Sequence, residues 1–330
     1  MRILITRKAR NLFLSKKLPM AAAALLAISL PVVLGLAQAK QKMPDWQKAA
    51  GGKMEFEVAA IKPAEPGKRI EANIALNINN EQIPPGGRLV VQGPLSDLIG
   101  FAYKLMTTRD QEQAMLSHLP KWVASDDFVI EARADGNPTK DQMRVMMQSL
   151  LTDRFKLNLH FETRDEPVLA LVLDKPEKTG PRLRPHAEGL PCDATWTAPP
   201  DRSSPSVAPG GFMPICGPVQ AIDGPNHAAI LGARDISIPH LAFYLGTIPP
   251  VSEFGRPVVD ETGLSGTFDF SLSVTPPRRR TSASEPDAQP DAGETTFDEA
   301  LKEQLGLKLK PTRAAIQVLV IDHVERPSAN

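Results

Sequence analysis

The sequence predicts an α+β fold with two tandem copies of a strand-helix-strand-helix-strand-strand module and mostly antiparallel sheets. Two aliphatic runs, Val168–Asp174 and Ile316–Asp322, each end in aspartate and each follow a helical pattern and a shorter apolar strand pattern. The same order of patterns precedes both runs, at offsets that drift between 140 residues (Phe128 to Phe268) and 150 residues (Phe155 to Leu305). Such drift is expected of a duplicated unit with loop insertions, and chance agreement of common patterns is the alternative.

The first module is predicted over residues 54–175. Short apolar and β-branched runs bounded by Pro, Gly or Asn indicate strands at 56–61, 88–92, 128–132, 155–161 and 168–174. Helical spacing of apolar residues predicts helices at 94–103 and 140–152, the second of them capped by Thr139. We interpret residues 64–87 as a loop, 107–117 as a polar, mobile stretch, and Arg164–Pro167 as the turn between the last two strands.

The second module is predicted over residues 226–328, where these patterns return. A helical pattern at 236–244 precedes a strand pattern at 268–272, and Thr296 is placed to cap a helix over 297–305. Alternating leucines at 305–309 and the second aliphatic run then predict the last two strands. Residues 276–294 interrupt the module and are rich in Pro, Ser, Asp and Arg, so we expect a disordered insertion there.

The amino terminus, residues 1–39, has the composition of a secretory signal peptide. Six Lys or Arg residues and no acid precede an apolar run over 18–36, and Ala37-Gln38-Ala39 matches a cleavage pattern. The run is close to the ~20 residues that span a bilayer, so an uncleaved anchor with its basic side in the cytoplasm is the alternative. A buried soluble helix would leave the charge asymmetry without a role. We expect an extracytoplasmic protein, periplasmic or secreted, that contacts the membrane only through this segment and continues into a polar tether over 40–53.

The charge balance argues against nucleic acid as a partner. The chain carries 38 basic and 38 acidic residues, and removal of the six basic residues in the leader leaves 32 against 38, a net charge of −6. A nucleic-acid-binding protein needs a basic face instead. Hydrophobic residues make up 42% of the chain but aromatic residues only 5%, and there are 32 prolines, which predicts a modest core with much irregular chain.

The two cysteines, Cys192 and Cys216, both lie in a connector over residues 176–225 that is rich in Pro, Gly and Ser. An exported chain with an even number of cysteines favours a disulfide, and two cysteines allow one intramolecular pairing. Such a bond would staple the connector between the two modules. Two free thiols in a loop are the alternative.

Two strand-end sequences each carry a His-x-Glu pair, and an arginine follows each pair. These residues are His160, Glu162 and Arg164, and His323, Glu325 and Arg326. Residues two apart share a strand face, so two such pairs could bind zinc if they met. We favour the interpretation that they are outward-facing polar positions, linked to the two arginines. No metal and no other cofactor is expected.

The remaining candidates for catalysis have simpler interpretations. Gly263–Thr267 resembles a nucleophile elbow, but its second glycine comes one residue early and a strand pattern follows where a helix is needed. We interpret it as a turn whose backbone Asp260 binds, and Asp174 and Asp322 as turn formers at strand ends. The sequence shows no phosphate loop, no dinucleotide fingerprint and no nucleophile–base–orienter trio. We therefore expect no catalytic residues and no enzyme activity.

Several longer motifs resemble one family of proteins. They are Phe56–Pro63, Leu95–Tyr103, Leu150–Arg164, Arg256–Gly266 and Val320–Pro327. Together they resemble the soil-associated family of uncharacterised exported bacterial proteins, over roughly residues 54–328. The resemblance implies no activity. Some relatives are fused behind membrane metallopeptidase-like sensor proteins that respond to β-lactams; this chain has no His-Glu-x-x-His motif, so the fusion context is only a hint of a sensory setting.

Two functions from different classes follow from these observations. The favoured one is a non-catalytic binding or sensory module of the cell envelope, whose partner is an unidentified envelope protein or small ligand. The alternative is an envelope hydrolase with an unrecognised active site. A deep pocket with clustered ionisable groups would favour the hydrolase, whereas a shallow groove or an exposed sheet edge would favour binding.

Overall fold

The structure is a computed structural model that describes residues 44–80, 83–186, 212, 216–223, 228–274 and 296–327. Residues 42–330 belong to one compact unit. Helices and mostly antiparallel sheets confirm the predicted α+β class, while the tandem duplication stays a prediction. Within these described ranges no helix is both long enough and apolar enough to cross a membrane. The predicted signal peptide or anchor, residues 1–39, lies outside them.

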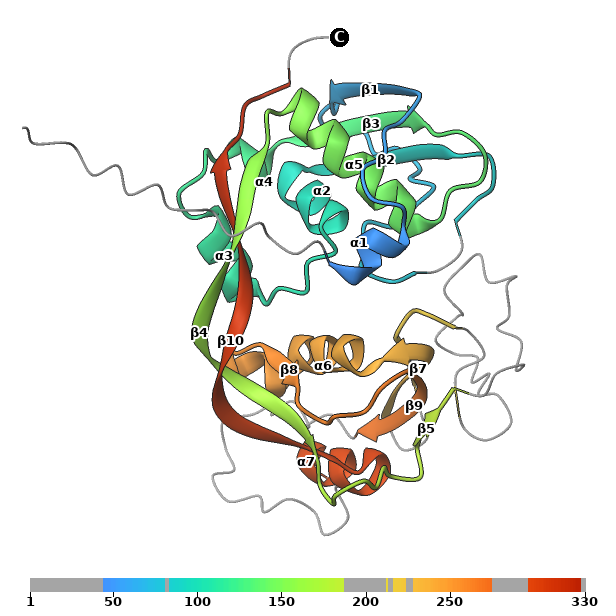
Figure 1. Cartoon of the computed structure of the whole chain (residues 1–330), viewed down its shortest axis with the longest axis vertical. Coiled ribbons are helices and arrows are strands. Elements are labelled where there is room, and N and C mark those ends of the chain that lie inside the picture. The colour runs from blue at the N-terminus through green and yellow to red at the C-terminus, as the bar shows by residue number, and fades with distance from the viewer. Residues whose placement is uncertain are drawn as a thin grey trace, which may run out of the picture. The chain divides into compact units, whose positions relative to one another are not determined.

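A first hydrophobic core lies between an antiparallel sheet and helices from the amino-terminal half of the chain (Figure 1). The sheet has the order β1-β3-β2, with β1 at Val58–Pro63, β3 at Asp127–Arg133 and β2 at Arg88–Pro94. Its main helices are α2 (Leu95–Ala102) and α5 (Lys140–Arg154), and α5 buries nine of its residues. The shorter helices are α1 (Asp45–Ala49), α3 (Arg109–Leu116) and α4 (Trp122–Ser125).

A second hydrophobic core is built from the carboxy-terminal half. Its sheet has the order β5-β9-β7-β6, with β5 at Leu183–Pro185, β9 at Thr267–Val274, β7 at Ala229–Ser237 and β6 at Gln220–Asp223. The helices are α6 (Ile238–Thr247), the 3₁₀ turn η2 (Val251–Phe254), and α7 (Phe297–Ala300), which continues into the π-helical turn η3 (Leu301–Leu305).

Two long strands serve both cores. The strand β4 (Asn158–Leu173) pairs antiparallel with β10 (Leu307–His323) along its whole length, and β8 (Val258–Asp260) adds a short parallel strand on β4 (Figure 1). Leu159, near the start of β4, packs against the first core, whereas Leu171 at the other end packs in the second. In β10 the order is reversed, because Leu307 lies in the second core and Ile321 in the first. Each strand therefore carries residues of both cores.

The predicted turn at Arg164–Pro167 is wrong, because β4 runs straight through it. The polar residues there belong to the exposed middle of the two-stranded ribbon, where Pro167 lies opposite Arg313. Antiparallel pairing with β10 supplies the backbone hydrogen bonds, so polar and proline residues do not interrupt the strand. The same holds in β10, which merges the two strands predicted at 305–309 and 316–322.

Other boundaries also differ from the sequence interpretation. The predicted tether contains α1, whose Gln47 amide donates to the Gln148 side chain of α5 at 2.8 Å. The stretch 107–117 holds α3, which Thr108 caps, although it buries only Met115 and so shows little apolar periodicity. The predicted connector contributes β5 and β6 to a sheet. Strand β7 went unrecognised because a register shift between Ala233 and Ile236 breaks its alternation.

Several local predictions are confirmed. Thr139 and Thr296 each cap the helix predicted for them through a capping box. Oδ1 of Asp260 accepts hydrogen bonds from the Thr262 backbone N–H at 2.9 Å and from its hydroxyl at 2.8 Å, which holds the predicted turn. The predicted disordered insertion, 276–294, and most of the connector lie outside the described residues.

Candidate functional site

His160 and Glu162 lie on β4, in a network with the neighbouring strand β10. His160 Nδ1 lies 2.9 Å from Oδ2 of Asp322, and His160 Nε2 lies 3.2 Å from Oε1 of Glu162. Arg164 donates two hydrogen bonds to Glu162, at 2.9 and 2.8 Å. Hydrogen bonds to Asp322 and Glu162 raise the pKa of His160, and Arg164 lowers the pKa of Glu162. The side chains remain about two-fifths exposed, so this is a solvated surface network.

The second predicted pair is also an exposed contact. His323 Nε2 lies 2.8 Å from Oε1 of Glu325. Arg326 is not linked to this pair, because it donates to Asp126 at 2.7 Å and lies 5.0 Å from the centre of the Trp122 ring. In the described ranges no three His, Cys, Asp or Glu side chains are grouped so that they could hold a metal ion.

The described residues do not test the predicted disulfide between Cys192 and Cys216. The backbone of Cys216 forms an isolated parallel β-bridge with Arg234 of β7. Its predicted partner, Cys192, lies outside the described residues. The Cys192–Cys216 bond therefore stays a prediction.

Two adjoining cavities lie along helix α6, and we call them together the α6 groove. The first has a volume of about 360 Å³ and is lined by residues 76–78, α2, α3 and α6. The second has a volume of about 350 Å³ and is lined by α6, β8, residues 106–111 and two residues of β10. Phe243 and Thr247 line both cavities, so the two cavities adjoin along α6.

The first cavity combines apolar walls with two carboxyl groups. Phe101, Phe243 and Tyr244 supply aromatic surface, and Asp97 of α2 and Glu112 of α3 supply the acids. Partial burial raises the pKa of Asp97, although the Ser96 hydroxyl at 3.5 Å lowers it. Such a carboxyl can bind a cation when ionised or donate a proton when neutral.

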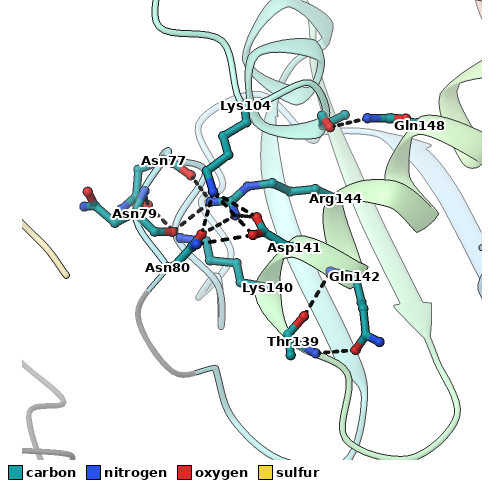
Figure 2. Close-up of polar contacts among 11 residues, drawn as sticks. Asn77, Asn79, Asn80, Lys104, Thr139, Lys140, Asp141, Gln142, Arg144 and Gln148 are labelled. Carbon is teal, nitrogen blue, oxygen red and sulfur yellow. Dashed lines mark hydrogen bonds and ion pairs between the residues drawn. The ribbon is translucent and has the colours of Figure 1, made fainter. Parts of the chain in front are cut away.

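A partly buried polar cluster, whose contacts Figure 2 shows, adjoins the first cavity. Its members are Asn77, Asn79, Asn80, Lys104, Lys140, Asp141 and Arg144. Asn77 lines the cavity and accepts a hydrogen bond from Lys140 Nζ at 2.6 Å. Phe101 also lines the cavity, and Lys140 and Arg144 lie 6.0 and 5.3 Å from the centre of its ring. The cluster thus fixes two residues that a ligand would touch.

Arg144 is the centre of this cluster and is fully buried. Its Nη2 donates to the carbonyl oxygens of Asn77 and Asn79, at 2.9 and 2.7 Å, and its Nη1 donates to Asn80 Oδ1 at 2.7 Å and to Asp141 (Figure 2). These bonds satisfy backbone groups in a segment without regular structure. Lys104 lies 3.2 Å from Asp141, and burial lowers the pKa of Lys104.

The cluster also influences helix α6. Burial, Lys104 and Arg144 lower the pKa of His240 to about 4, so its imidazole is neutral at neutral pH. One turn later, the Tyr244 hydroxyl donates to Asn79 at 3.4 Å, and the rings of His240 and Tyr244 are 5.3 Å apart. These contacts hold the side chain of Tyr244 where it lines the first cavity.

The sequence interpretation singled out none of the groove acids as site residues. Asp97 belongs to a family-like motif that was interpreted as an ordinary helix, and Glu112 lies in the stretch interpreted as mobile. Two local signals were present. Thr108 and Gln111 match the capping-box spacing of a helix start, and Gly100 interrupts the face of α2 that carries Asp97.

Comparison with known proteins gives a family and nothing more specific. No curated protein and no solved structure matches the chain. A family model does match residues 96–324, which include both long strands, α3, α6 and all of α2 except Leu95. This match covers more than half of the chain, and on that basis the protein belongs to the family described as protein of unknown function (DUF3738).

Proposed function

We propose that this protein is a non-catalytic binding module of the cell envelope and that the α6 groove is its binding site. The observation that carries the proposal is the pair of adjoining cavities that share Phe243 and Thr247. Each exceeds the ~300 Å³ at which small-ligand sites begin, and each combines apolar walls with a few polar groups, as binding sites do.

The envelope location rests on the amino-terminal sequence. The basic, acid-free start and the apolar run over 18–36 are typical of an export signal or anchor. A reporter enzyme fused after Asn330 should be active only outside the cytoplasm. Activity of the fusion in the cytoplasm would contradict this part of the proposal.

The polar groups of the groove favour binding over nucleophilic catalysis. A hydroxyl nucleophile needs a hydrogen-bonded base that a third group orients. The Ser96 hydroxyl lies beside Asp97 at 3.5 Å, and among the described residues no serine or threonine of the groove is bonded to a histidine. Hydrogen bonds of the polar cluster around Arg144 also hold Asn77 in the wall, which suits a preformed binding surface.

Two methionines that line the groove can report binding in an NMR experiment. Met115 lines the first cavity and Met106 the second, whereas Met143 lies in the core of α5. Methionine methyl NMR spectra of the purified protein should be recorded against neutral, cationic and anionic aromatic fragments and short peptides. We expect at least one class to shift the Met115 or Met106 methyl signal and to leave Met143 unchanged. If no compound shifts either signal at millimolar concentration, the groove is not the binding site.

One observation favours hydrolysis as a second candidate function. The pKa of Asp97 is raised by burial and Asp97 shares its cavity with a second carboxyl group, that of Glu112; two carboxyl groups in one site are a common acid–base arrangement. Purified protein should be tested for turnover of chromogenic esters and glycosides. Turnover that Asp97→Asn abolishes, while folding is preserved, would replace the binding proposal with the hydrolase.

A further inference from the structure

The charge of the α6 groove is of one sign. Three acids line it, Asp97 and Glu112 in the first cavity and Asp260 in the second, and among the described residues no Lys, Arg or His lines either cavity. None of the three forms an ion pair with a described residue: Asp97 contacts Ser96, and Asp260 contacts the Thr262 backbone and hydroxyl. The nearby cations Lys104 and Arg144 are instead committed to Asp141.

The first cavity also offers aromatic surface to a cation. Phe243 and Tyr244 line it with ring centres 5.8 Å apart in an edge-to-face arrangement, and both side chains are half-buried. Aromatic faces attract ammonium and guanidinium groups, most strongly where water is partly excluded. Carboxylates and aromatic rings together therefore fit a cationic group carried on an apolar stem, such as a Lys or Arg side chain.

The second cavity offers the groups that a peptide backbone needs. Uncharged polar groups come from Gln111 and Gln317, beside apolar walls that include Met106 and Pro257. Gln111 Oε1 belongs to the capping box of α3 and Gln317 Nε2 donates to Thr163, so the groups offered to a peptide are Gln111 Nε2 and Gln317 Oε1. The strand β8 lines this cavity and is the last strand of its sheet. Extended peptides bind next to such edge strands and place alternate side chains into pockets about 7 Å apart. Nucleic acids and anionic lipid surfaces are negatively charged, and the charged groups that they would meet in the groove are carboxylates, which would repel them.

We propose that the α6 groove binds an extended peptide segment that presents a Lys or Arg side chain to the first cavity and apolar side chains to the second. This inference rests on the proposed function and names the ligand class of the same site. The partner is accordingly a basic, apolar segment of another protein. Binding of a free organic amine in its place is one outcome of the test.

The probe is a fluorescein-labelled heptapeptide with lysines in one half and leucines in the other, compared with two peptides in which norleucine or glutamate replaces each lysine. Binding is measured by fluorescence anisotropy with the purified full-length protein. We expect the lysine peptide to bind at least about tenfold more tightly than the norleucine peptide and the glutamate peptide to bind most weakly. The norleucine peptide tests the charge at constant apolar length.

Two sets of variants locate the site. A Cβ at Gly100 would point into open space, with no heavy atom within 4 Å, and Gly100 lines the first cavity. Gly100→Met should therefore fill the cavity while improving helix propensity, so that the protein still folds and binding falls about tenfold or more. The double variant Asp97→Asn/Glu112→Gln should cause a similar loss for the lysine peptide only. Glu57→Gln/Glu303→Gln removes two exposed charges elsewhere and should change binding less than about twofold.

The outcomes separate this inference from the function on which it rests. Equal binding of all three peptides, or unchanged binding by the Asp97/Glu112 double variant, would overturn the cationic-peptide inference but leave the groove as a binding site. Competition by hexylamine as strong as by unlabelled peptide would assign the site to small amines and overturn the peptide part. Failure of every probe to shift the Met115 and Met106 signals would instead remove the proposed function itself.

Discussion

The two halves of the protein contain the same helix-to-strand junction but use different residues in it. In the first half Phe155, Lys156 and Leu157 follow α5, and in the second half Leu305 ends η3 and is followed by Gly306 and Leu307. The outer residues of both junctions are buried, and both middle residues have a left-handed backbone, with φ of 52° at Lys156 and 70° at Gly306. The local backbone requirement is therefore the same.

The difference between the junctions comes from what packs against them. Residues 178–180 pass across the second junction, and a Cβ at Gly306 would lie 2.5 Å from the Gly180 backbone nitrogen. Lys156 instead reaches solvent, and its Nζ donates to the Asp153 carbonyl at 2.8 Å. Lysine tolerates the left-handed region at a cost of about 1–2 kcal/mol. Glycine is thus required in one half by close backbone approach, and the other half has no such requirement.

The largest expected effect is on the buried polar cluster of α5, which is built around Arg144. Arg144→Met would remove the donor to the Asn77 and Asn79 carbonyls and one of the cationic partners of Asp141, and we expect a loss of about 3–5 kcal/mol in the free energy of unfolding. Arg313→Met is the control, because Arg313 pairs with Asp165 on the exposed ribbon and should cost less than about 1 kcal/mol. Denaturant titration measures both, and equal losses would show that burial does not decide the value of these pairs.

The junction comparison gives the second prediction. Gly306→Ala should lower the free energy of unfolding by about 2–4 kcal/mol, because it adds left-handed strain to a backbone clash. Lys156→Gly should instead be neutral or stabilise the protein by up to about 1 kcal/mol, since glycine removes the strain. Urea midpoints of the two variants test this directly. A tolerated Gly306→Ala would mean that residues 178–180 can move away.

Two histidines should respond to pH in opposite directions. The pKa of His240 is lowered to about 4, so the unfolded chain binds more protons between pH 6.5 and 4 and stability is lost as the pH falls through that window. This amounts to about 2 kcal/mol by pH 4.5. His240→Gln should remove that part of the pH dependence, as measured by denaturant titrations at pH 4.5 and 7. Parallel pH profiles for the two proteins would contradict the environment assigned to His240 beside Lys104 and Arg144.

His160 provides the contrasting case. Its pKa is raised by Asp322 and Glu162, so its stabilising effect is present at low pH and is lost as the pH rises through its folded-state pKa. The network is exposed, so His160→Gln should change the pH profile far less than His240→Gln does. NMR titration of the two imidazoles should show His160 above its ordinary pKa and His240 well below it.

The smallest expected effect concerns the helix caps that the two halves share. Thr139→Ala and Thr296→Ala should each cost about 1 kcal/mol, because each threonine closes a capping box with the residue three positions later. Similar losses would support equivalent roles for α5 and α7, and thermal unfolding can measure them. A loss at Thr139 only would show that α7 is held by its buried Ala300 and by η3 rather than by its cap.

Sequence patterns were most informative for features that depend on interactions between residues close together in the chain. Thr139 and Thr296 were identified as caps because side chain, backbone and spacing all lie within four residues. The turn at Asp260 was identified for the same reason. The predicted break at Arg164–Pro167 was wrong because a strand's backbone partners lie elsewhere in the chain, and here β10 supplies them. Helix α3 was missed because only Met115 of its residues is buried.

The sequence by itself determined the α+β class, the positions of most helices and strands, and an amino-terminal segment typical of export. These depend on propensity and periodicity, which each short segment carries within itself. Only the tertiary structure decided that β4 and β10 carry residues of both cores, that Gly306 must be glycine, and that Asp97, Glu112 and Asp260 line one groove beside Phe243. Those facts are contacts between residues far apart in the chain, and no local pattern encodes which distant residue will meet which.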